Sequence, residues 1–177
     1  GQMVCDLASR LGEDPCELVM NVLHDDHLTT NGIYHCMADE DVDQVLRFSR
    51  SMIGSDGLYY KGCSGAHPRA FGTFTRVLGH YVRERKVLSL EEAIHKMTGL
   101  PAAVYQLHGK GLIRPGMDAD LVLFDPDTVS DQAGFTDFSK RGTGIDTVWI
   151  QGRKVVEHGA YLGVKAGKLI RHAPHNS

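Results

Sequence analysis

Apolar residues at the start of the chain recur with the spacing of a helix. They occupy i, i+1, i+4, i+5 and i+8, at Met3, Val4, Leu7, Ala8 and Leu11. A second helix is predicted directly afterwards, because Asp14 is a suitable N-cap and Pro15 fits the first helical position. The polar stretch 24–31 ends this pattern.

The next segment predicts a strand, a helix and a second strand. Residues 32–37 (GIYHCM) are short, β-branched and aromatic, as in a buried strand. Three acidic residues at 39–41 suit the start of a helix, where the macrodipole favours carboxylates. A short apolar run at 51–53 follows this helix. The order predicts a βαβ unit, with two parallel strands and a right-handed crossover.

Helices dominate the pattern up to about residue 110, and strands follow. Helical spacing covers 71–82, Ser89 and Glu92 form a capping box, and Pro101 begins a short helix. Runs of β type then occur at 119–124, at 147–150 with 154–156, and at 168–171. The middle two runs flank Gln151-Gly152 and predict a hairpin. A domain boundary is expected near residue 110.

Composition and charge exclude several classes of protein. The chain has 177 residues, 42% of them hydrophobic, and a net charge of −3, which is ordinary for a globular protein. No basic patch suggests a nucleic-acid partner, and no apolar run approaches the ~20 residues that span a membrane. No signal peptide is evident, and none of the four cysteines forms a C-x-x-C pair, so a cytoplasmic location is expected.

The segment Gly54-Ser55-Asp56-Gly57 is the most informative place for chemistry. It puts a carboxylate directly after a predicted strand, where catalytic groups of parallel α/β barrels lie. The flanking glycines allow a sharp turn and the close approach of a ligand. The alternative is that Asp56 only caps the next segment or forms a turn.

A second candidate is His67-Pro68-Arg69, in a glycine-rich loop. The planar guanidinium of Arg69 suits recognition of a carboxylate. The alternative is that Arg69 ties the loop to a nearby aspartate or carbonyl group.

Other polar clusters offer weaker chemistry. Metal-ligand residue types occur at His24, Asp25, Asp26, His27, His35 and Cys36. Their spacing matches no catalytic zinc motif such as H-E-x-x-H, so a solvated polar loop is the favoured interpretation. Cys63 could be a nucleophile, but nothing nearby in the sequence marks an activated thiolate.

The sequences around Asp56 and Arg69 together resemble those of the N-acyl-D-amino-acid deacylase (D-aminoacylase) branch of the amidohydrolases. The S-D-G string with the H-P-R string is quite specific to that branch, and the likeness extends from about residue 32 to 171. Further similar strings lie at 78–84, 89–93, 96–102, 116–125 and 144–152.

The resemblance implies an α/β fold, a (β/α)8 barrel that carries a small β-sandwich. Residues 1–110 would be the C-terminal part of the barrel, with 52–53 in its eighth strand. Residues 111–177 would be the C-terminal share of the sandwich. The chain is therefore expected to be a fragment of a longer enzyme.

The resemblance also implies a reaction, the hydrolysis of N-acyl-D-amino acids. Zinc would lower the pKa of a bound water, and Asp56 would move the proton as general acid and base. Arg69 would bind the substrate carboxylate, and His67 would orient Arg69 or line the pocket. Nothing in this chain matches the family's zinc ligands, so no metal ligand is assigned and the chain alone is expected to be inactive.

Two other functions remain open. One is a related amidohydrolase that acts on a cyclic amide or a dipeptide. The other is a non-catalytic module that assembles with other chains, because a partial barrel exposes strand edges that could pair in a homo-oligomer.

Overall fold

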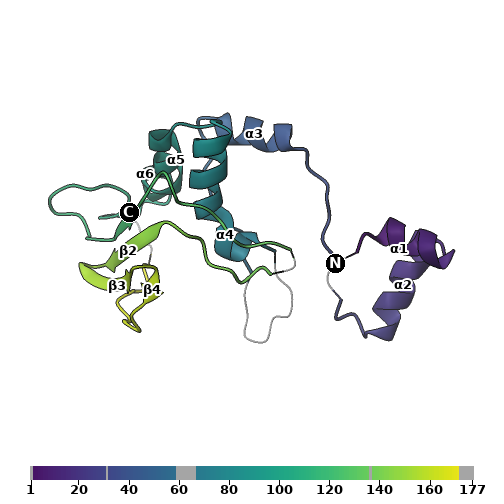
Figure 1. Ribbon diagram of the computed structural model, residues 1–177. Coiled ribbons are helices and arrows are strands. Elements are labelled where there is room, and N and C mark those ends of the chain that lie inside the picture. The colour runs from purple at the N-terminus through teal and green to yellow at the C-terminus, as the bar shows by residue number, and fades with distance from the viewer. Residues whose placement is uncertain (1, 31, 59–66, 136, 172–177) are drawn as a thin grey trace, which may run out of the picture.

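The computed structural model describes residues 2–30, 32–58, 67–135 and 137–171 as seven helices and one sheet (Figure 1). The helices are α1 (Val4–Leu11), α2 (Pro15–Asp25), α3 (Asp39–Arg47), α4 (Arg69–Arg76), η1 (Val77–Glu84), α5 (Leu90–Met97) and α6 (Gly99–Val104). The strands are β1 (Leu121–Phe124), β2 (Ile145–Ile150), β3 (Arg153–Glu157) and β4 (Ala160–Tyr161). None of these helices is long and apolar enough to cross a bilayer.

The first two helices form where their local signals predicted. Gly12 adopts a left-handed conformation (φ 71°) that ends α1. The Asp14 carboxylate accepts hydrogen bonds from the backbone N–H groups of Cys16 (2.8 Å) and Glu17 (3.2 Å), so it caps α2. Figure 1 shows the α1–α2 pair standing apart from the other helices, joined to α3 by an extended segment.

The central helices surround a small apolar core. Val77, Val87, Leu88 and Ala93 are buried together, and partly buried residues such as Leu46 cover them. The predicted capping box begins α5. Ser89 Oγ accepts the Glu92 N–H (3.2 Å), and Glu92 Oε2 accepts the Ser89 N–H (2.9 Å).

Helix α4 continues into η1, a π-helical stretch of eight residues. Such stretches are rare and commonly mark functional sites. Gly79 lies within η1 against the backbone of the 126–131 segment. A methyl group at this position would lie 2.6 Å from the Val129 carbonyl oxygen. Glycine is therefore required for this close approach.

The four strands form one antiparallel meander in the order β1-β2-β3-β4. The predicted hairpin is confirmed as β2 and β3. Gln151 (φ 52°) and Gly152 (φ 72°) both have positive φ, as a two-residue type I′ turn requires. The first β-type run is confirmed as β1.

Three predicted strands are wrong. Residues 32–37, 52–53 and 168–171 form no strand, so the βαβ unit is absent from the described structure. Tyr34 and Met37 in the first of these segments are largely exposed instead of buried. A strand needs a hydrogen-bonded neighbour, and the Ile53 N–H instead reaches the Lys96 carbonyl oxygen of α5 (3.1 Å).

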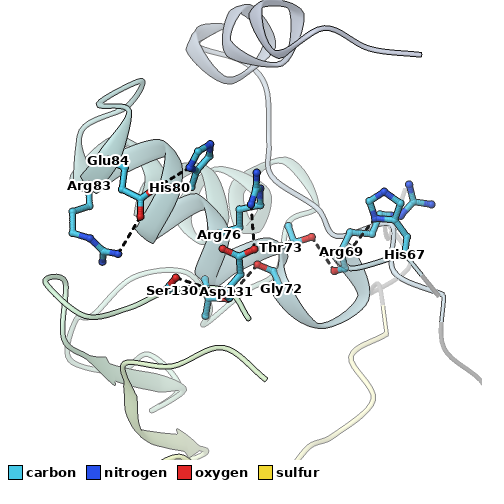
Figure 2. Close-up of polar contacts among 11 residues, drawn as sticks. His67, Arg69, Gly72, Thr73, Arg76, His80, Arg83, Glu84, Ser130 and Asp131 are labelled. Carbon is cyan, nitrogen blue, oxygen red and sulfur yellow. Dashed lines mark hydrogen bonds and ion pairs between the residues drawn. The ribbon is translucent and has the colours of Figure 1, made fainter. Parts of the chain in front are cut away.

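The segment between β1 and β2 packs back on the long helix α4–η1. Arg83 donates to the carbonyl oxygens of Val129 (2.6 Å) and Pro126 (3.1 Å). Arg76 pairs with Asp131 at 3.2 Å, one to two turns earlier on the helix (Figure 2). Residues on either side of the expected boundary near 110 therefore contact each other closely.

Candidate functional site

Asp56 has a backbone conformation that is uncommon for residues other than glycine. Its φ of 45° is in the left-handed region, which aspartate tolerates better than most residues. Strained backbone of this kind gathers at functional sites. Its side chain is 80% exposed, so the carboxylate is accessible to a ligand.

Gly57, the next residue, packs closely against the start of α4. A methyl group at Gly57 would lie 2.8 Å from the Cα atom of Ala70, so a larger residue would push the two segments apart. The S-D-G string and the H-P-R string, ten residues apart in sequence, are thereby held side by side.

Arg69 joins the two strings through two N–H donors on one edge of its guanidinium. Its Nη2 atom lies 2.8 Å from Asp56 Oδ2, and its Nε–H donates to the Asp56 carbonyl oxygen (2.9 Å). This is the alternative contact that the sequence left open, an arginine that binds a nearby aspartate and carbonyl. The same contacts show that its guanidinium presents two parallel donors to oxygen acceptors.

His67 contacts Arg69 through the backbone. The Arg69 N–H donates to His67 Nδ1 at 3.2 Å, just before the first turn of α4 (Figure 2). Shielding from water lowers the pKa of His67 from 6.5, and the Arg69 cation lowers it further. The imidazole is therefore neutral at pH 7, as an acceptor at Nδ1 must be.

Phe135, in the segment between β1 and β2, was missed by sequence reasoning. Its ring meets the edge of the His67 ring at a centroid distance of 5.1 Å and an interplanar angle of 88°. It also meets His35 at 5.8 Å and 64°. A large aromatic residue in a polar loop was the only available signal, and it did not identify the partner.

A row of ion pairs continues along the helix beyond Arg69. His80 Nδ1 lies 2.9 Å from Glu84 Oε2, and Arg83 lies 3.6 Å from the same carboxylate (Figure 2). The hydrogen bond with His80 is the main reason that the pKa of Glu84 is lowered. These contacts link residues within η1 and do not include Asp56.

The described residues do not form a metal site. Among them, no three His, Cys, Asp or Glu side chains converge as ligands. His24 pairs with its neighbour Asp25 (3.0 Å) in solvent, and His35 packs on Phe135. Cys63 lies outside the described residues. The metal centre implied by the resemblance therefore does not fit the residues of the described structure.

Comparison with known proteins decides the family. The family model described as "Amidohydrolase family" matches residues 4–156, most of the chain. The chain belongs to the amidohydrolase family.

Two curated relatives of this amidohydrolase come from Alcaligenes xylosoxydans xylosoxydans. A D-aminoacylase is 46% identical over 138 residues, which is 78% of this chain and 28% of the relative. An N-acyl-D-aspartate deacylase is 50% identical over 123 residues, 70% of this chain and 24% of the relative. They confirm the resemblance to the D-aminoacylase branch. The chain spans about a quarter of each relative's length.

Solved structures of related deacylases resemble the fold of this chain. A D-aminoacylase described with a binuclear metal centre superposes with a TM-score of 0.80 at 41% identity, over 94% of this chain and 34% of that one. An N-acyl-D-glutamate deacylase from Bordetella bronchiseptica, in complex with zinc and a phosphonate inhibitor, gives 0.75 at 38% identity, over 88% and 31%. The mixed helix and sheet arrangement is thus that of an amidohydrolase.

Proposed function

We propose that this chain is part of an enzyme that hydrolyses the amide bond of N-acyl-D-amino acids to a D-amino acid and a carboxylic acid. The observation that carries the proposal is the contact of Arg69 with Asp56 at 2.8 Å. It puts a carboxylate-binding cation and an acid–base group within reach of one small molecule.

Substrate chemistry fits this pair. In an N-acyl amino acid, the amide nitrogen is only two bonds from the carboxylate carbon. A substrate carboxylate bound by Arg69 therefore brings the scissile amide close to Asp56. An ion pair this exposed is weak, so a ligand carboxylate can replace Asp56 at the guanidinium.

The released Asp56 carboxylate then moves the proton. It accepts a proton from the attacking water as the water oxygen adds to the acyl carbon. When the C–N bond breaks, the same carboxyl group donates that proton to the departing amine. Atoms and charge balance, and Asp56 returns to its ionised form.

The fold and cofactor of the complete enzyme are further parts of the proposal. The proposed (β/α)8 barrel would include residues 1–110, and the proposed β-sandwich would include residues 111–177. All described helices lie before residue 105 and all described strands lie after residue 120, which supports this division. Zinc bound to the related N-acyl-D-glutamate deacylase supports a zinc cofactor, with its ligands contributed by residues outside this chain.

The test is hydrolysis by the complete enzyme of N-acetyl-D-amino acids beside their L-enantiomers, a cyclic amide and a dipeptide. Preferential release of a D-amino acid is expected. Faster cleavage of the cyclic amide or the dipeptide would replace this proposal with the related amidohydrolase.

One observation favours a role in assembly as well. Strand β1 is an edge of the sheet, and its Val122 (55%) and Leu123 (52%) are exposed. Such an edge can pair with another chain, including a second copy. Light scattering of the purified chain is expected to show a dimer, and a monomer at all concentrations would contradict this role.

A further inference from the structure

We propose that Phe135 is a positioning residue of this site, which holds the His67 ring so that His67 fixes the start of α4 and the direction of Arg69. The inference deepens the proposed function and rests on it for the role of Arg69 in binding the substrate.

The first step is the ring contact. The rings of Phe135 and His67 meet nearly at right angles, with their centroids 5.1 Å apart. This is a favourable edge-to-face geometry for an aromatic pair. Phe135 also meets His35 at 5.8 Å, so its half-exposed ring contacts two segments that are far apart in sequence.

The second step is the link from His67 to Arg69. His67 Nδ1 accepts the Arg69 N–H, which is one of the unpaired donors at a helix start. Pro68 lies between them and limits the backbone. Rotation of the His67 ring would break this bond and leave the Arg69 N–H at the start of α4 without this acceptor.

The third step is the link from Arg69 to the reacting groups. Arg69 contacts Asp56 with both its Nη2 and Nε atoms, so the orientation of its guanidinium depends on where α4 begins. Small displacements of a positioning group can cost large factors in rate or binding. Phe135 therefore connects the β-rich part of the chain to the site.

The first experiment follows the titration of the His67 ring by NMR in this chain. Among the described residues, the charged or titratable groups linked to the ring are Arg69 on α4, Asp56 paired with Arg69, and His35 in contact with Phe135. Phe135→Ala removes a ring that packs on His67 and so exposes more of the imidazole to water, and the His67 pKa is expected to rise toward 6.5. Phe135→Tyr keeps the ring and is expected to preserve the lowered pKa.

Phe138→Ala is the matched control on the same loop. Phe138 contacts Phe71 (6.4 Å between centroids) and not His67, so its loss is expected to leave the His67 titration unchanged. The proposal is overturned if Phe135→Ala titrates like the parent chain, or if Phe138→Ala shifts His67 equally.

The second experiment measures KM and kcat of the complete enzyme with an N-acetyl-D-amino acid. Phe135→Ala is expected to raise KM about two- to tenfold, the worth of one edge-to-face pair, with a smaller change in kcat. In a His67→Ala background, the same substitution is expected to have no further effect on KM, because Phe135 acts through His67. Additive effects would overturn the proposal.

The two experiments separate the possible failures. Absence of any N-acyl-D-amino-acid hydrolysis by the complete parent enzyme would defeat the proposed function, while the His67 titration would still decide the positioning role. An unchanged titration with normal turnover would defeat the positioning role alone.

Discussion

Lys96 Nζ donates to Ser51 Oγ at 3.0 Å and to the Ser51 carbonyl oxygen at 3.2 Å. The same ammonium donates to the Phe48 carbonyl oxygen (2.5 Å), just after α3. Lys96 is only 5% exposed, and its three protons have three oxygen acceptors. This lysine therefore ties α5 to the end of α3 and to the segment that leads to Asp56.

Replacement of Lys96 by methionine is expected to destabilise the chain by about 2–4 kcal/mol, because carbonyl groups lose a charged donor in a buried place. Urea unfolding followed by circular dichroism measures this. Lys165→Met, at an exposed position, is the control and should change stability by less than about 0.5 kcal/mol. Equal stability of the two variants would show that the Lys96 contacts contribute nothing.

In the complete enzyme, Asp56→Asn is expected to lower kcat by at least about 100-fold, the low end for the loss of a general acid–base group. Asparagine tolerates positive φ as well as aspartate does, so the backbone conformation at this position should remain. Steady-state kinetics with an N-acetyl-D-amino acid provides the measurement. Asp25→Asn, on the exposed end of α2, is the control. Near-normal turnover of Asp56→Asn would remove Asp56 from the mechanism.

Arg69→Lys keeps the charge but loses the planar pair of donors. If Arg69 binds the substrate carboxylate, KM is expected to rise about tenfold or more, since one charge-assisted hydrogen bond is worth about 1.5–3 kcal/mol. Substrates whose carboxylate is converted to an amide should bind parent and variant equally. An equal loss of affinity for both kinds of substrate would contradict this role.

Gly79→Ala is expected to destabilise the chain by about 1–3 kcal/mol, although alanine is the better helix former. The added methyl group would meet the Val129 carbonyl oxygen at 2.6 Å and the Ser130 Cα at 3.2 Å, both backbone atoms. Thermal unfolding is the measurement, with Gly167→Ala as control because a methyl group there meets nothing within 4 Å. A stabilised Gly79→Ala variant would show that the helix and the 126–131 segment separate easily.

Protonation of Asp120 is expected to lower the free energy of unfolding at acid pH. A hydrogen bond from Lys110, and then one from the Gln151 N–H, lowers the pKa of Asp120 below 3.8. Its contribution is therefore complete above pH 3.8 and is lost as the pH falls through the lower folded-state value.

Deprotonation of Lys110 is expected to lower the free energy of unfolding at alkaline pH. Asp118 and then Asp120 raise its pKa above 10.5, so its contribution is complete below that pH and is lost as the pH rises through the raised value. Asp120→Asn should reduce the loss of unfolding free energy at acid pH by no more than about 1 kcal/mol. Urea unfolding of the parent chain and Asp120→Asn across pH tests this prediction. An equal loss of stability at acid pH in the two proteins would contradict it.

Local chemistry was sufficient to predict several elements from the sequence alone. The cap at Asp14, the box of Ser89 with Glu92, and the Gln151-Gly152 turn all depend on atoms within a few residues of each other. The resemblance carried by the S-D-G and H-P-R strings likewise gave the family, which the comparisons confirm.

Strand formation and contacts between residues far apart in sequence were decided only by the tertiary structure. The predicted strands at 32–37 and 52–53 do not form, because a strand requires a neighbour that its own residues cannot supply. The contact of Phe135 with His67 and the fit of Gly79 against Val129 join residues 68 and 50 positions apart. Short-range capping and turn geometry are contained in the sequence, whereas such long-range contacts arise only when the chain packs.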